Sequence, residues 1–139
     1  MLAAGLCAAV GGCGGGSGGG ASSNTPTGPS GTTPSVGATV TITSAGVNPQ
    51  QIRIQAGEVV RFVNNDSVAH VPSSNPHPTH HDCPGVNNVG TLQAGAGANT
   101  SAFTTTRSCG FHDHNNPDDS RFAGQILVGN AAAEPGPGY

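Results

Sequence analysis

The sequence predicts an all-β domain of about seven to eight strands over residues 36–129, either a sandwich or a Greek-key barrel. Short runs of alternating polar and apolar residues recur along this region, and clusters of Gly, Pro, Asn and Asp separate them. No window carries apolar residues at the i, i+3, i+4, i+7 spacing of an amphipathic helix. Short strands at regular spacing with turns between them are typical of a sandwich or a Greek-key barrel.

Three strands are expected in the first half of the domain. Residues 39–43 alternate polar and apolar side chains, which places Val40 and Ile42 on one buried face. Residues 51–55 repeat the pattern, and residues 58–63 form a third alternating run. The expected turns lie at residues 46–50, 56–57 and 64–67.

The second half of the domain combines a long loop with further strands. Residues 72–89 are polar and rich in Pro, Asn and His, and long loops of this kind in small domains are usually functional or disordered. Strand-like stretches follow at residues 91–95, 101–106 and 124–128.

The first 13 residues are small and apolar, like the hydrophobic region and cleavage site of a secretory signal. They lack a cationic leader and are short for a signal, so we expect the true start to lie upstream. Val10-Gly11-Gly12-Cys13 resembles a bacterial lipobox, and Cys13 is the expected lipidation site. Cys7, which follows Leu6, fits that pattern less well. The alternative is a low-complexity tail with an incidental cysteine.

A flexible tether is expected at residues 14–35, because these residues offer too little apolar surface to offset the entropy of ordering. Such a spacer suits an exported lipoprotein, held in the periplasm or at the outer membrane. Residues 130–139 are expected to be a disordered tail. No run approaches the roughly 20 apolar residues of a membrane span, so we expect membrane contact only through the lipid anchor.

The charge pattern disfavours two classes of partner. The cationic residues Arg53, Arg61, Arg107 and Arg121 are scattered, and the chain contains no lysine. A nucleic-acid or anionic-membrane surface needs clustered cations, so neither is expected. An enzyme is not favoured either, because no general acid–base pair and no serine in a nucleophile elbow stands out.

A thiol and two imidazoles lie within six residues, at Cys109, His112 and His114. A further histidine, His70, ends the most strand-like run of the chain, far away in sequence. A thiolate with imidazoles from two distant segments is a ligand set that suits one copper ion. We expect a tight loop between Cys109 and His112, in which Gly110 lets the backbone turn sharply.

Two separated parts of the chain form a recognisable pattern. The first comprises Gly46-Val47-Asn48-Pro49, Ile52-Arg53-Ile54, the run 57–66 and Ala69-His70. The second is Cys109-x-x-His112, followed by a glycine and a β-branched strand at residues 124–128. Together they resemble the cupredoxins of the plastocyanin and azurin type. The resemblance implies a Greek-key β-sandwich that transfers electrons to a partner through a mononuclear copper, with His70, Cys109 and His112 as ligands.

The sequence departs from the cupredoxin pattern at the axial ligand. The family usually has a methionine a few residues after the second histidine, whereas Met1 is the only methionine here. Asn115, Asn116, a backbone carbonyl or a water remain for that position. His114 is another candidate, because residues two apart in an extended segment point the same way. A centre that includes His114 is richer in nitrogen.

Cys83 leaves the role of Cys109 open. Two cysteines in one exported domain suggest a disulfide, which would remove the thiolate ligand. The sequence alone does not decide between the thiolate and the disulfide. With a disulfide, the ligands left for copper would be His70, His112, His114 and either His77 or His80. His77 and His81 are expected to be exposed loop residues, and for His80 the sequence does not decide between a loop residue and a ligand.

These observations favour an exported copper protein, a monomer that shuttles electrons to or from a redox partner. The first alternative is a copper carrier or scavenger with a histidine-only site and a copper donor or acceptor as its partner. The second is a small copper oxidoreductase, in which the missing methionine leaves an open coordination position. A metal-free adhesion sandwich is disfavoured by the concentration of histidines.

Overall fold

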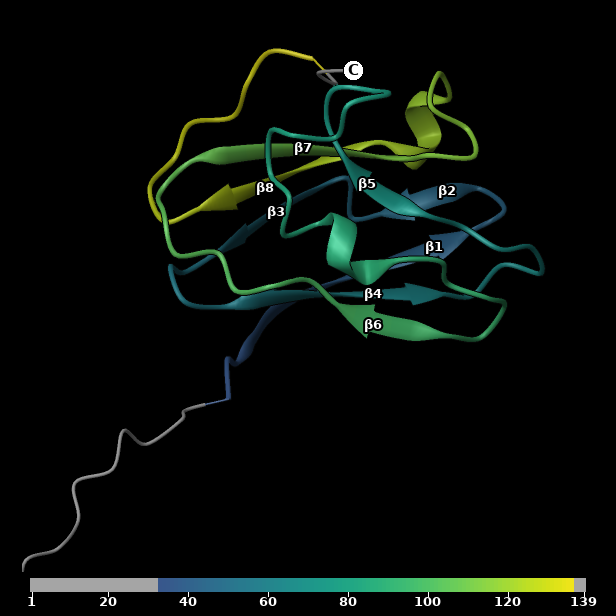
Figure 1. Ribbon diagram of the computed structural model, residues 1–139, viewed down its shortest axis with the longest axis horizontal. Coiled ribbons are helices and arrows are strands. Elements are labelled where there is room, and N and C mark those ends of the chain that lie inside the picture. The colour runs from purple at the N-terminus through teal and green to yellow at the C-terminus, as the bar shows by residue number, and fades with distance from the viewer. Residues whose placement is uncertain (1–32, 137–139) are drawn as a thin grey trace, which may run out of the picture. The chain divides into compact units, whose positions relative to one another are not determined.

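The computed structural model describes residues 33–136 and contains two sheets of four strands each (Figure 1). The strands are β1 (Val36–Thr43), β2 (Gly46–Asn48), β3 (Gln51–Ile54), β4 (Val59–Asn64), β5 (Pro72–Ser74), β6 (Gly97–Asn99), β7 (Ser108–Asp113) and β8 (Gly124–Val128). Two short 3₁₀ helices complete this part of the chain, η1 (Asn87–Val89) and η2 (Ser120–Phe122). The expected all-β sandwich is confirmed.

Several predictions made from the sequence fall outside the described residues. These are the signal-like segment 1–13 with Cys7 and Cys13, most of the tether 14–35, and the last three residues of the tail 130–139. Between residues 33 and 136, no helix is long and apolar enough to cross a lipid bilayer.

The chain passes repeatedly from one sheet to the other. One sheet has the strand order β2-β1-β4-β6, and the other has the order β3-β8-β7-β5. β1 runs parallel to β4, and β3 runs parallel to β8, while the remaining neighbours are antiparallel. Parallel neighbours cannot be joined by a hairpin, and the chain crosses between the layers after β2, β3, β4, β5 and β6.

The core fills the space between the two sheets. Val40, Ile42 and Phe62 are buried from one sheet, as their alternating pattern predicts. Phe111 and Ile126 are buried from the other. The rings of Phe62 and Phe111 meet edge to face across the core, with centroids 5.2 Å apart and an interplanar angle of 87°. This arrangement is a favourable one for aromatic pairs.

Two of the expected strands are not present as strands. At residues 91–95 there is a single bridge, in which Leu92 and His70 exchange backbone hydrogen bonds of 2.8 and 3.0 Å. Residues 101–106 form an irregular segment in which only Phe103 is buried. The β-branched residues there resemble a strand, but their side chains have no layer to pack against. The strand that pairs with β4 lies earlier, at β6.

The expected tight loop between Cys109 and His112 is wrong. Both residues lie on β7, which pairs with β8 at Cys109 and with β5 at His112. Because side chains alternate along a strand, Cys109, Phe111 and Asp113 face one side of this sheet. Gly110 and His112 face the other side. Gly110 therefore makes no turn, and two side chains expected to act together point in opposite directions.

We predict that Phe111→Ala lowers the free energy of unfolding by about 3–5 kcal/mol, because it removes a buried ring and its aromatic partner contact. Urea titration followed by circular dichroism measures this change. Val36→Ala is the control, since Val36 is 47% exposed and its truncation should change stability by less than about 0.5 kcal/mol. Equal effects of the two substitutions would contradict this account of the core.

Candidate metal centre

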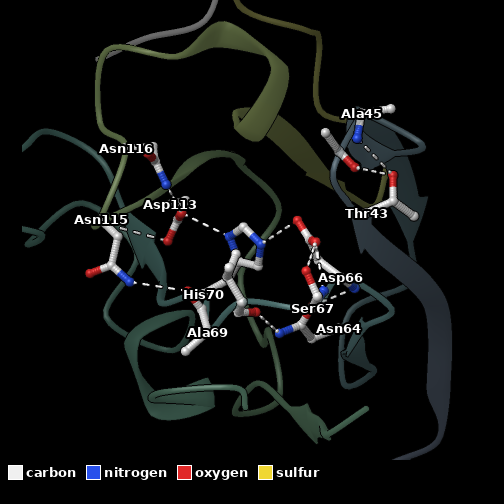
Figure 2. A network of polar contacts seen from close by, with 12 residues as sticks. Thr43, Ala45, Asn64, Asp66, Ser67, Ala69, His70, Asp113, Asn115 and Asn116 are labelled. Carbon is white, nitrogen blue, oxygen red and sulfur yellow. Dashed lines mark hydrogen bonds and ion pairs between the residues drawn. The ribbon is translucent and has the colours of Figure 1, made fainter. Parts of the chain in front are cut away.

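His70 is enclosed in a network of carboxylates (Figure 2). Its Nδ1 lies 2.9 Å from Asp113 Oδ2, and its Nε2 lies 3.2 Å from Asp66 Oδ2. The ring is 1% exposed and stacks on Phe122, with centroids 5.0 Å apart. Both ring nitrogens therefore have hydrogen-bond partners in this structure.

Asp113 is the centre of this carboxylate network. Burial by itself would raise the pKa of Asp113, but hydrogen bonds from the Val71 amide, the His70 ring and the Asn116 side chain hold it below its usual value. Val71 N–H donates to Oδ1 over 2.7 Å, and Asn116 Nδ2 donates to Oδ2 over 2.7 Å. Asn116 thus belongs to this network. Asn115 lies beside it, with its side-chain amide 3.3 Å from the carbonyl of Ala69.

Cys109 is bonded to Cys83 in a disulfide, with a Cα–Cα distance of 5.8 Å. Both cysteines are buried, at 0% and 4% exposure. Of the two states that the sequence leaves open, the structure contains the disulfide, so Cys109 offers no thiolate here. The disulfide instead ties the loop that follows β5 to β7.

The loop of residues 75–83 is held at both ends. At its base, Asp82 N–H donates to the Asn75 carbonyl over 3.0 Å, and Cys83 N–H donates to Ser74 Oγ over 2.7 Å. At its middle, Asn87 Nδ2 donates to the His80 carbonyl over 2.8 Å. His80 has a φ of 48°, in the left-handed region that non-glycine residues seldom adopt. Such strained residues cluster at functional sites.

Four imidazoles meet where this loop lies against β7. We call His77, His80, His112 and His114 the histidine cluster. Ligand atoms of His77, His80 and His112 all lie within 4.8 Å of one another. His80 Nε2 lies 3.2 Å from His112 Nε2 and 3.3 Å from His114 Nδ1. His112 is buried, His80 is half-buried, and His77 and His114 are exposed, so the cluster opens to solvent.

The surroundings keep the inner rings of the histidine cluster uncharged. Burial, followed by the neighbouring rings of His80, His77 and His114, lowers the pKa of His112 to about 4. Burial and then the rings of His114 and His77 also lower the pKa of His80 below its usual value. Neutral imidazole is the form of histidine that binds metals, because one of its ring nitrogens has a free lone pair.

The spacing and chemistry of the cluster fit a metal ion. Two nitrogens bound about 2.1 Å from one tetrahedral ion lie about 3.4 Å apart. The observed nitrogen separations around His80, 3.2 and 3.3 Å, are close to that value. Imidazole nitrogen suits copper, zinc, nickel and iron. The residues that would hold the ion are His77, His80 and His112, with His114 beside them.

The residues predicted from the sequence to bind copper lie in three different environments in the structure. His80, His112 and His114 come together, whereas His70 lies in the carboxylate network and Cys109 in the disulfide. His81 is exposed, and its Nδ1 lies 2.8 Å from Thr79 Oγ1.

Sequence reasoning favoured an exposed loop position for His77 and named it as a copper ligand only as an alternative to His80, in the case of a disulfide. His77 is exposed, but its ring also faces the cluster, with its centroid 5.1 to 5.6 Å from those of the other three rings. The spacing His77-x-x-His80 was the available signal, because it places two imidazoles in one short loop.

Comparison with known proteins identifies the architecture. No family model and no curated protein matches the sequence. Among solved structures, a purple cupredoxin from Nitrosopumilus maritimus is 18% identical with a TM-score of 0.50, over 66% of this chain and 99% of that chain. A plastocyanin from Dryopteris crassirhizoma is 14% identical with a TM-score of 0.51, over 66% and 99% of the two chains. This chain has the cupredoxin fold.

A third match, an amicyanin variant, is 13% identical with a TM-score of 0.51 over 68% of this chain and 82% of that chain. At these identities the likeness establishes the fold, and the sequence resemblance to cupredoxins is confirmed to that extent. Within this cupredoxin fold, the three residues that the resemblance assigns to copper, His70, Cys109 and His112, have three different environments.

We predict that the metal-free protein loses stability as the pH falls from about 6.5 to about 4. An unfolded chain protonates His112 near 6.5, whereas the folded chain does so only near 4. The unfolded state therefore binds more protons in this window, and the stability present above pH 6.5 is lost as the pH falls through the folded pKa. Urea midpoints measured in chelator across this range test the prediction.

His112→Gln should flatten this pH dependence between 6.5 and 4, because it removes the titrating ring. His81→Gln is the matched control and should leave the dependence unchanged, since His81 is exposed and lies outside the histidine cluster. Asp113 titrates at lower pH, because its pKa is held below its usual value. Parallel curves for wild type and His112→Gln would contradict the assignment.

Proposed function

We propose that this protein binds one copper ion through the histidine cluster and holds it for exchange with a copper donor or acceptor outside the cytoplasm. The observation that carries the proposal is the convergence of His77, His80 and His112 within 4.8 Å. The rings come from a tethered loop and a core strand, so folding brings the donors together before a metal arrives. This preorganisation lowers the entropic cost of binding.

Copper is favoured over other metals by the donors and by the fold. Divalent ions bind nitrogen sites with affinities that rise to Cu²⁺ and fall again at Zn²⁺. The amicyanin variant among the structural matches is described as its Cu(I) form. The disulfide between Cys83 and Cys109 fits an oxidising compartment. The signal-like segment at residues 1–13 supports export to such a compartment.

Holding and exchanging copper is favoured over electron transfer by the state of Cys109. A redox centre that serves both oxidation states is best supplied by a thiolate together with two imidazoles. Here the sulfur is in a disulfide, and the exposed rings of His77 and His114 leave one side of the centre open to a partner. Electron transfer to a redox partner is the second candidate, and the cupredoxin fold is the observation that favours it.

The test is a copper titration of the purified protein with Cys7→Ser and Cys13→Ser. We expect one Cu²⁺ per chain, nitrogen couplings in its electron paramagnetic resonance spectrum, weak visible absorption, and no free thiol before reduction. His80→Ala should lower the affinity by about 100-fold or more, which exceeds the usual effect of losing an outer-sphere contact. His81→Ala is the matched control and should bind as wild type does.

The double substitution Cys83→Ser with Cys109→Ser should also weaken copper binding, because it frees one end of the loop that carries His77 and His80 without releasing a thiol. An intense visible band together with a free thiol would instead identify a thiolate centre, and the protein would then be an electron carrier. Failure of His80→Ala to change the affinity would exclude the histidine cluster as the site.

We also propose that the chain is exported and anchored by a lipid on Cys13, with residues 14–35 as a tether. The small residues before Cys13 and the Gly-, Ser- and Thr-rich sequence after it support this. Expressed with its native upstream region, the protein should partition with membranes, and Cys13→Ser should release it. Cys7→Ser is the matched control and should stay with the membranes. Equal partitioning of all three proteins would exclude the anchor.

A further inference from the structure

Asn75 makes the shortest side-chain contact of the histidine cluster. Its Oδ1 lies 2.6 Å from His112 Nδ1. Both residues are almost completely buried, with Asn75 6% exposed and His112 0% exposed. Asn75 directly follows β5, whereas His112 lies on β7, so the contact joins the start of the loop to the strand.

This contact decides which ring nitrogen of His112 has a lone pair available to bind a metal ion. A neutral imidazole carries one N–H and one lone pair. If Nδ1–H donates to the Asn75 oxygen, the lone pair lies on Nε2. Nε2 is the atom that faces the cluster, 3.2 Å from His80 Nε2. The opposite tautomer would direct an N–H into the cluster and block a metal there.

We propose that Asn75 is a positioning residue that holds His112 in the Nδ1–H tautomer and thereby presents Nε2 to the metal. The proposal rests on the function proposed above and adds the contact that orients His112, the buried ligand of the site. Metal-binding histidines commonly donate their second N–H to an oxygen acceptor, which fixes both the tautomer and the ring orientation. An amide oxygen does this without adding a charge to the buried side of the site.

The backbone on either side fixes Asn75 itself. Asn75 N–H donates to the Gly110 carbonyl over 3.1 Å, and the Asn75 carbonyl accepts from Asp82 N–H over 3.0 Å. The side-chain amide lies directly against Gly110: a Cβ at that position would come within 3.0 Å of Asn75 Cγ and would collide with Nδ2. The absence of a side chain at Gly110 therefore gives the Asn75 amide its place next to His112.

Nitrogen-15 NMR of the metal-free full-length protein tests the proposal directly, because two-bond couplings distinguish the imidazole tautomers. At pH 7.5 we expect His112 to be the Nδ1–H tautomer, with its signals assigned by their loss in His112→Gln. Asn75→Asp, which keeps an oxygen acceptor, should retain this tautomer. Asn75→Leu, which has similar size and no acceptor, should shift His112 towards Nε2–H. Asn88→Leu is the matched control, at an exposed asparagine on η1, and should change nothing.

Copper titration of the same variants gives the second measurement. Asn75→Leu should weaken Cu²⁺ binding by about 10- to 100-fold, and Asn75→Asp should stay within a few-fold of wild type. If Asn75→Leu does not fold, Gly110→Ala takes its place, because the added methyl displaces the Asn75 amide and should produce the same tautomer shift.

The outcomes separate this proposal from the function on which it rests. An Nε2–H tautomer in the wild type, or an Nδ1–H tautomer that survives both Asn75→Leu and Gly110→Ala, would overturn the role of Asn75 even if copper binds. An Nδ1–H tautomer that depends on Asn75, in a protein that binds no copper at the cluster, would support the positioning role and overturn the proposed function.

Discussion

The alternation of side chains along β7 is the constraint on which the rest of this structure depends. A strand directs successive residues to opposite faces, so Cys109, Phe111 and Asp113 face the interior while His112 faces the loop of residues 75–83. The interior residues supply the disulfide, the aromatic contact with Phe62 and the carboxylate that pairs with His70. The core and the candidate metal centre are thus built on the two faces of one strand.

The carboxylate network around His70 holds two segments of the chain together at one end of the sandwich. It joins the segment after β4, which carries Asp66 and His70, to Asp113 at the end of β7. Removing one partner from a buried pair of this kind typically costs about 3–5 kcal/mol, because it leaves the other polar group without compensation. Since both nitrogens of His70 are used in this way, a metal would have to compete with two carboxylates for the ring.

Much of the fold follows from local pattern, whereas the site depends on contacts between distant residues. The burial of Val40, Ile42 and Phe62 could be predicted because alternation is a property of each short segment. The tight turn expected at Gly110 failed because the partners that keep β7 extended, Ser73 and Ile126, lie far away in sequence. For the same reason, spacing alone could not show that Cys83 pairs with Cys109 or that His70 pairs with Asp113. The spacing His77-x-x-His80 was visible in the sequence, but it did not show that His112 on β7 lies next to these rings.

The disulfide also links the loop that carries His77 and His80 to the redox conditions around the protein. It links residues 26 apart in sequence, and a cross-link of that span removes roughly 3–4 kcal/mol of conformational entropy from the unfolded chain. In a reducing cytosol both sulfurs remain thiols, so a newly made chain lacks this constraint on the loop that carries His77 and His80. If the chain is exported as proposed, oxidation outside the cytosol would add this constraint to the loop that carries His77 and His80.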